Sequence, residues 1–392
     1  ENMSASNQYT YILLSSYLHA AAECSSYLYY DEPFSPSSGA QSNLPVLLAE
    51  YRLSSPGDIE NYLSILAQIP AYLEGLTLYE QEKADCGLFM SDSCADKVIE
   101  QCAALMDKQA LASDSHFLEI TFAKRLNELL AQNLIEETEA EYWCAENKRL
   151  LTSVVAPAYD RLANELTLLK GSGVNSQGLA GFEYGREYYQ ANLRLITGSY
   201  RTIPEIKQML SGDFEKNYVS LITLLREEPA LNDSLSSVNS AFPTLPPEKI
   251  LAVLQEMTAD DYPALPLPAD CTVKYVDQAL EPYSAPAFYM IPPMDDTKEN
   301  TIYNNLLDTA EGLSLFTTLA HEGYPGHLYQ TVYSSYYQQA SDASPVRNLL
   351  SYGGYIEGWA TYAELHSYDY AIQLMKESHP ETGALYLAEK LN

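Results

Sequence analysis

Two histidines and a glutamate lie within seven residues of one another in the stretch His321-Glu322-Gly323-Tyr324-Pro325-Gly326-His327. Imidazoles are common zinc ligands, and a glutamate beside them is a suitable proton acceptor. In the familiar His-Glu-x-x-His helix the two histidines are four residues apart and share one face. Here the second histidine comes two residues later. At about 100° per residue, a regular helix would place the two imidazoles on different faces.

Pro325 and Gly326 offer a way around this problem. Proline has no amide hydrogen, and its ring would collide with the carbonyl of His321, four residues back. Glycine tolerates unusual backbone dihedrals. We therefore expect an irregular turn over Gly323–His327 that absorbs the two extra residues and lacks the i to i−4 hydrogen bond from residue 325. Such a turn would return His327 to the same metal.

A catalytic zinc site normally has three protein ligands and a water, so a third ligand is expected downstream. The segment Gly353–Glu364 opens with a glycine pair and continues as a helical pattern, in which Glu357, Thr361 and Glu364 share one face. We predict Glu357 as the third zinc ligand. Glu364 is either the acceptor of a hydrogen bond from a ligand imidazole or a structural carboxylate.

This His₂Glu set predicts metal-assisted amide hydrolysis. Zinc lowers the pKa of its water toward neutrality, and Glu322 is placed to take the proton and pass it to the leaving amine. Tyr355 is a candidate donor to an oxyanion. In a chain with 33 tyrosines, packing with a satisfied hydroxyl is the alternative for Tyr355. Zinc is the predicted cofactor, although the same ligands accept other first-row metals.

The helix that delivers His321 and Glu322 should begin near Thr309. Asp308 and Glu311 form an Asp-x-x-Glu version of the capping box, a signature of a helix start. Apolar residues then recur along the segment up to the first histidine, as an amphipathic helix requires.

The rest of the chain divides into stretches that differ in apolar spacing and proline content. Upstream of residue 235, apolar residues recur at spacings of three and four, which predicts a mainly α, multi-helix scaffold. Prolines concentrate from Phe242 to Pro293, where the β-prone pieces Thr272–Val276 and Ala287–Ile291 predict a small β element near the active-site cleft, either a small sheet or an extended strand. Thr301–Asn304 is either an ordinary loop or an edge strand that pairs with an extended peptide. The predicted ranges are a helical region (1–235), a Pro-rich segment (236–300) and the zinc-site helices (301–392), unless these form one continuous domain.

The composition excludes some classes of partner. Asp and Glu number 53 against 22 Lys and Arg, so the formal charge of −31 would repel nucleic acid. No apolar run reaches the roughly 18 residues that span a bilayer. Glu1 and the small polar stretch Ser4–Gln8 are typical of a processed or trimmed N-terminus, which predicts a secreted or surface-held, lipoprotein-like protein. The six cysteines are expected to be buried thiols or to form one or two bridges, with Cys86–Cys94 the first candidate pair.

The stretches HEGYPGH (321–327) and EGWATYAE (357–364) resemble the paired motifs of the domain of unknown function 885 (DUF885) family, helical gluzincin-like metallopeptidases. The likeness extends over most of the chain. It implies His321, His327 and Glu357 as metal ligands and Glu322 as the catalytic carboxylate. Members of this family usually continue past the second motif with helices that carry an Arg- and His-containing segment, so one wall of the cleft is expected to be missing from these 392 residues.

We therefore expect a metallopeptidase that cleaves short peptides. One alternative is a binding or scaffold protein with a relic metal site, against which the presence of Glu322 argues. Another is a metal hydrolase that acts on a non-peptide amide or an ester.

Overall fold

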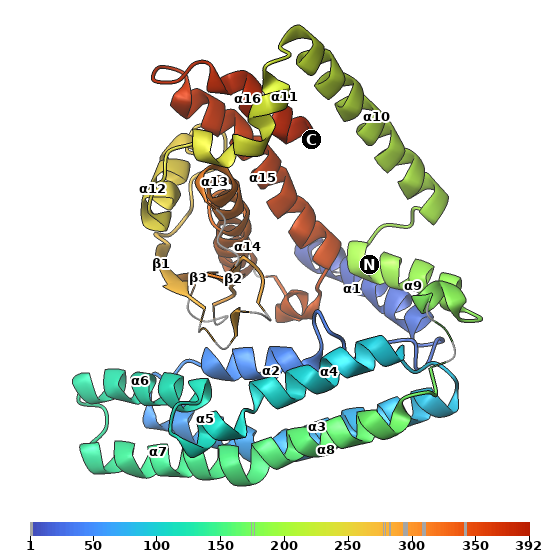
Figure 1. Cartoon of the computed structure of the whole chain (residues 1–392), viewed down its shortest axis with the longest axis vertical. Helices are drawn as coiled ribbons and strands as arrows, with labels where there is room; N and C mark the ends of the chain where they lie inside the picture. The colour runs from blue at the N-terminus through green and yellow to red at the C-terminus, as the bar shows by residue number, and fades with distance from the viewer. Residues whose placement is uncertain are drawn as a thin grey trace. The chain divides into compact units, whose positions relative to one another are not determined.

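The computed structural model describes residues 3–173, 175, 177–276, 278, 280–281, 284–292, 297–307, 311–340 and 343–392. The chain folds into two compact units (Figure 1): unit 1 comprises Glu1–Ser25 and Gln190–Asn392, and unit 2 comprises Ser26–Tyr189. Helices dominate both units, and one small sheet lies in unit 1. The predicted fold class, mainly α with a small β element, is confirmed.

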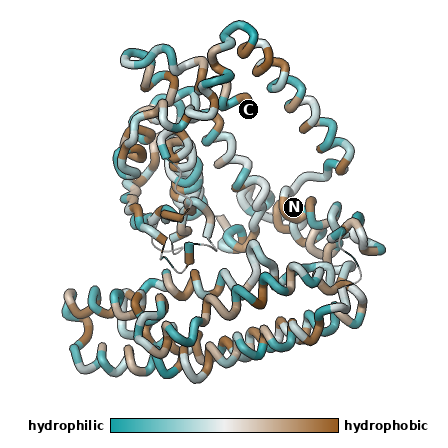
Figure 2. The backbone as a smooth tube through the Cα atoms, in the orientation of Figure 1, coloured by the Kyte–Doolittle hydropathy of each residue, from teal (hydrophilic) through white to brown (hydrophobic). Residues whose placement is uncertain are grey.

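The described residues of unit 2 form helices joined by turns and irregular segments, with no strand among them. Its long helices are amphipathic, and Figure 2 shows hydrophobic and hydrophilic residues interspersed along them. The predicted spacing pattern explains the packing, because Tyr62 and Leu66 on one helix and Phe122 on another are fully buried. The Tyr62 and Phe122 rings stack with centroids 4.9 Å apart. The elements of unit 2 are α2 (Ala40–Ala49), α3 (Pro56–Asp85), α4 (Asp92–Leu105), α5 (Lys108–Ala112), α6 (Phe117–Ala131), α7 (Glu137–Leu150), the π-helical turn η1 (Leu151–Val155), α8 (Ala156–Leu169) and the 3₁₀ turn η2 (Gly178–Gly181).

Unit 1 holds the remaining helices and all three strands of the described chain. Helix α9 (Gly185–Thr197) begins in unit 2 and ends in unit 1. The other elements are α1 (Ala5–Cys24), α10 (Ile203–Glu227), α11 (Leu231–Ser234), η3 (Leu235–Ser237), η4 (Asn239–Ala241), α12 (Pro247–Met257), β1 (Asp270–Tyr275), β2 (Ala287–Met290), β3 (Glu299–Asn304), α13 (Gly312–Glu322), α14 (His327–Ala340), η6 (Pro345–Leu349), α15 (Gly353–Met375) and α16 (Thr382–Leu391).

The sheet has the order β1-β3-β2, with β1 parallel and β2 antiparallel to β3. The β-prone pieces predicted at Thr272–Val276 and Ala287–Ile291 correspond to β1 and β2. The edge-strand expectation for Thr301–Asn304 is wrong, because this segment belongs to β3 and is paired on both sides. The alternative of an ordinary loop is wrong as well, and neither could be decided beforehand because the sequence does not show which distant strands pair.

Helix α1 joins the C-terminal part of the chain rather than the helices that follow it. Arg347 donates from Nε to Thr10 Oγ1 at 2.9 Å and from a terminal nitrogen to the Ser6 carbonyl at 2.7 Å. The rings of Tyr17 and Tyr352 meet edge to face with centroids 5.7 Å apart. The units are therefore divided after residues 25 and 189, whereas the predicted ranges changed at residues 235 and 300.

Helix α13, which carries the first histidine, begins at Gly312 with Glu311 at its N-cap. The expected start at Thr309 and the Asp308 half of the predicted capping box lie outside the described residues. Gly312 has φ of +55°, and a Cβ there would lie 1.8 Å from the carbonyl oxygen of Asn239. Only glycine fits this approach.

The inner face of α13 packs into the core of unit 1. Phe316, Leu319 and Ala320 are fully buried, and so are Leu328 and Val332 on α14. Burial of each large apolar side chain stabilises the fold by about 1.5–3 kcal/mol. The two helices that carry the histidines are thus held by packing on both sides of the turn between them.

Two further expectations concern the whole chain. None of the described helices combines the length and apolar character needed to cross a bilayer. All six cysteines are free thiols, so the structure contains neither the suggested Cys86–Cys94 bridge nor another. The sequence spacing of cysteines alone could not decide between thiols and bridges, because pairing depends on the distance between Cα atoms.

Candidate metal centre

The backbone between α13 and α14 absorbs the two extra residues of the histidine spacing. Helix α13 ends at Glu322 and α14 begins at His327, with an irregular turn between them. Gly326 N donates to Ala320 O at 2.9 Å, and Tyr329 N donates to Gly323 O at 3.2 Å. Each of these bonds spans six residues where a regular helix spans four. The predicted irregular turn is present.

Gly326 permits this turn because it has no side chain. A Cβ at this position would lie 1.7 Å from His321 O and 2.4 Å from Ala320 O. Trp359 on α15 closes the turn from outside, because its Nε1 donates to Pro325 O at 2.8 Å. Helix α15 therefore supports the turn as well as carrying Glu357. No role for Trp359 was predicted, since spacing alone does not show which carbonyl a tryptophan reaches.

The three predicted ligands converge. Glu357 Oε2 lies 3.5 Å from His321 Nε2 and 3.6 Å from His327 Nε2. The three donor atoms lie within 4.8 Å of one another, and no other group of this kind occurs among the described residues. The two imidazole planes are inclined by 83°. Donors held about 2.0–2.2 Å from one zinc ion at tetrahedral angles lie roughly 3.3–3.6 Å apart, so the donor set fits such an ion after a small closure.

The exposure of the three side chains leaves the site open on one side. The side chains of His321 and His327 are 19% and 13% exposed, whereas that of Glu357 is 64% exposed. A metal held here would keep one face toward solvent, as a catalytic rather than a closed structural site requires.

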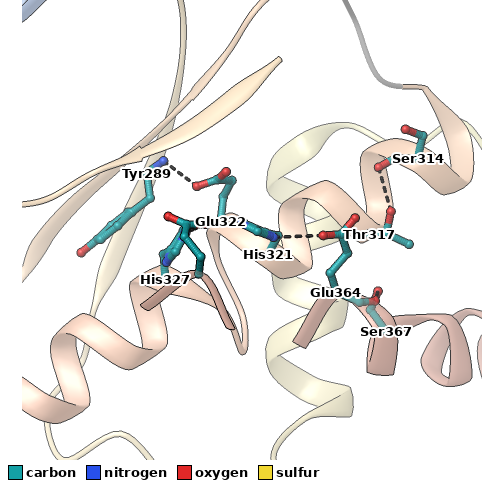
Figure 3. A network of polar contacts seen from close by, with 9 residues as sticks. Tyr289, Ser314, Thr317, His321, Glu322, His327, Glu364 and Ser367 are labelled. Carbon is teal, nitrogen blue, oxygen red and sulfur yellow. Dashed lines mark hydrogen bonds and ion pairs between the residues drawn. The ribbon is translucent and has the colours of Figure 1, made fainter. Parts of the chain in front are cut away.

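Glu364 orients the first histidine (Figure 3). His321 Nδ1 lies 3.0 Å from Glu364 Oε2, a bond that directs Nε2 toward the donor cluster. Burial acts to lower the pKa of His321, but the Glu364 hydrogen bond and the neighbouring carboxylates outweigh it and raise the pKa above its usual value. Burial and the adjacent His321 lower the pKa of His327. This geometry is the one expected if Glu364 accepts a hydrogen bond from the imidazole of His321.

The Glu322 side chain extends toward the sheet (Figure 3). Its side chain is 9% exposed, and Oε2 accepts a hydrogen bond of 2.8 Å from the backbone N–H of Tyr289 on β2. Burial raises the pKa of Glu322 to about 7, a shift that a bound divalent cation would oppose. The site therefore contains a buried carboxylate that is not part of the converging ligand set. The contact with Tyr289 was not predicted, because it joins residues 33 positions apart.

Tyr355 is placed differently from the other predicted site residues. It precedes Glu357 by two residues on α15, so the two side chains leave the helix about 200° apart. The Tyr355 side chain is 67% exposed. The helix thus directs Tyr355 away from the face that carries Glu357 and Glu364.

Comparisons with known proteins place the chain in a family. A crystal structure described as "the putative lipoprotein from Colwellia psychrerythraea" shares the fold, with a TM-score of 0.75 and 17% sequence identity over 92% of this chain. This chain spans 63% of the length of that one. A search of curated proteins found no match. The model of the family described as "Bacterial protein of unknown function (DUF885)" matches residues 1–377. The chain therefore belongs to the DUF885 family of bacterial proteins.

Proposed function

We propose that this protein is a metallopeptidase that hydrolyses peptide bonds in short peptides, with His321, His327 and Glu357 as zinc ligands and Glu322 as general base. One observation carries this proposal: two imidazoles and a carboxylate converge at ligand spacing beside a second, buried carboxylate. A purely structural metal site needs no such second acid.

A zinc ion at this site would polarise the scissile carbonyl and make a water more acidic. Glu322 would carry out the proton transfers. Its Oε2 is engaged by Tyr289 N–H, which leaves Oε1 to take a proton from the attacking water and to deliver it to the leaving nitrogen. His321 is held in one tautomer by Glu364, so its Nε2 lone pair stays directed at the metal position.

The edge strand β2 supports a peptide as the substrate. Asn305 N donates to Pro286 O at 2.8 Å, which marks a hydrogen-bonded pair at this end of the β2–β3 ladder. Because such pairs alternate along an antiparallel ladder, Ala287 and Tyr289 direct their backbone groups away from β3. Because the Tyr289 N–H already donates to Glu322, an extended peptide can pair with the backbone groups of Ala287 and with the carbonyl of Tyr289, whereas a small ester cannot use such a row of groups.

We also propose that the protein acts outside the cytoplasm, secreted or held at the cell surface. The Colwellia protein of the same fold is described as a lipoprotein, and no described helix of this chain could cross a membrane.

The acidic surface of a chain with a formal charge of −31 would favour neutral or basic peptides.

The test is made on the full-length natural protein, by zinc analysis and digestion of a short-peptide library at neutral pH. We expect about one zinc per chain and hydrolysis by the parent. His321→Ala should lose both zinc and hydrolysis. His366→Ala is the matched control, because His366 contacts Asp369 and Asp261 rather than the donor cluster, and it should keep both. A zinc-loaded parent without hydrolysis would favour a binding protein instead.

A further inference from the structure

The backbone of Tyr289 contacts Glu322, the candidate base, and its side chain contacts the neighbouring strand β3. The backbone N–H donates to Glu322 Oε2 at 2.8 Å. The ring is 8% exposed, and its hydroxyl donates to Asn300 Oδ1 at 2.6 Å. Tyr289 therefore connects α13, which carries Glu322, with β3, which carries Asn300.

Asn300 is a fixed anchor for this hydroxyl. Its side chain is 2% exposed, and Nδ2 lies 3.1 Å from the carbonyl oxygens of Thr297 and Lys298 and 3.4 Å from that of Asp270. Because three carbonyls surround the amide nitrogen, the amide oxygen must face Tyr289. The hydroxyl of Tyr289 is thus tied to β3 and, through the Asp270 carbonyl, to β1.

The register of β2 determines whether the backbone N–H of Tyr289 points toward Glu322. Tyr289 pairs with Ile302, so Asn300 is the diagonal neighbour two residues away on the same face of the sheet. A slip of β2 by one residue would turn the N–H of residue 289 toward β3 and away from Glu322. Strand β2 has only four residues, so its own ladder resists such a slip weakly. A slip by one residue would also carry the Tyr289 ring to the face opposite Asn300, so the Tyr289–Asn300 bond opposes it.

We propose that Tyr289 is a positioning residue for the Glu322 carboxylate: its hydroxyl, anchored on Asn300, fixes β2 in the register in which its N–H holds Glu322. This inference rests on the proposed function for its kinetic consequence alone. The hydrogen-bond relay itself exists whether or not Glu322 acts as a base.

The decisive variant is Tyr289→Phe, which removes the hydroxyl and keeps the ring and the backbone N–H. Tyr386→Phe is the matched control, because Tyr386 is also buried and its hydroxyl donates to the Ala241 carbonyl at 2.8 Å. Both variants lose one buried hydrogen bond and should lose similar thermal stability. Only Tyr289→Phe should lower kcat, by about fivefold, with KM and zinc content unchanged.

A second measurement does not depend on activity. In the parent, the amide of residue 289 should exchange slowly with deuterium, and Glu322→Ala should accelerate that exchange. Tyr289→Phe should accelerate it by about tenfold, and Tyr386→Phe should leave it unchanged. Unchanged exchange in Tyr289→Phe, or an equal kcat loss in Tyr386→Phe, would overturn the positioning role. Accelerated exchange in an inactive parent would instead keep the relay and remove the proposed function.

Discussion

Each unit of this protein buries one glutamate whose pKa is raised to about 7, chiefly because burial disfavours the charged form. In unit 1 this residue is Glu322. In unit 2 it is Glu80 on α3, which is completely buried and lies 3.6 Å from the Nζ of Lys83, itself completely buried. Lys83 also donates to the Asp31 carbonyl at 2.8 Å and pairs with Glu32 at 2.9 Å. The two pKa values are alike, and the surroundings are not.

The surroundings distinguish a candidate site from a structural cluster. Glu322 has two imidazoles and the exposed Glu357 beside it, so a substrate and a metal can reach its neighbourhood. Glu80 faces a lysine with no exposed side-chain surface, and its oxygens have no hydrogen-bond partner among the described residues. A shifted pKa reports burial in both cases. Accessible ligand atoms beside the carboxylate are what indicate chemistry.

The largest expected effect comes from exchanging each glutamate for glutamine. Glu322→Gln keeps the size of the side chain but cannot accept a proton, so peptide hydrolysis should fall by a factor on the order of 10² to 10⁴ while zinc content stays the same. Glu80→Gln should leave hydrolysis unchanged. Rates on a short peptide and zinc per chain measure both. Equal losses in the two variants would abolish the distinction drawn here.

A second comparison between the two units uses one glycine from each, Gly326 in unit 1 and Gly75 in unit 2. Gly326→Ala places a methyl group 1.7 Å from His321 O, so the turn must shift and zinc affinity should fall at least about tenfold. Gly75→Ala in α3 meets nothing within 4 Å and should stabilise the protein by about 0.5–1 kcal/mol. Zinc titration and urea unfolding measure these changes. Retention of full zinc affinity by Gly326→Ala would contradict the role of this turn.

The free energy of unfolding should vary with pH in part because Glu80 titrates. Its pKa in the folded chain is about 7 against 4.5 for the reference carboxyl, so the folded state binds the proton more tightly. The stabilisation is therefore complete below pH 4.5 and is lost as pH rises through about 7, amounting to at most about 3 kcal/mol. Urea unfolding at pH 5 and pH 8 should show a smaller loss in Glu80→Gln than in the parent, and the loss that remains in the variant comes from Glu322, whose pKa is also raised to about 7. A variant that keeps the parent's pH dependence would refute the assignment to Glu80.

A moderate effect on zinc affinity should follow from Glu364→Gln. The amide can still accept a hydrogen bond from His321 Nδ1, but without the charge, so zinc affinity should fall by about tenfold. Competition with a chelator of known affinity measures this change. Glu377→Gln, two residues past α15, provides a control that should leave zinc affinity unaltered.

Local chemistry made much of this structure predictable. The apolar spacings before residue 235 predicted amphipathic helices, because a 3.6-residue period leaves one face for the core. Pro325 and Gly326 predicted the interrupted helix, because proline lacks an amide hydrogen and glycine tolerates unusual backbone dihedrals. These are properties of single residues and their near neighbours, which any fold must respect.

Long-range pairing was not predictable in the same way. That β3 is the central strand, that α1 belongs with residues 190–392 and that Tyr289 N–H reaches Glu322 each depend on residues far apart in the sequence. The sequence by itself determined the donor types, the helical periods and the break between the two histidines. Only the tertiary structure decided that Glu357 lies within 4 Å of both imidazoles and that the edge strand β2 donates a hydrogen bond to Glu322. The reason is physical: such contacts arise when whole packed elements meet, and no short-range preference encodes which elements those will be.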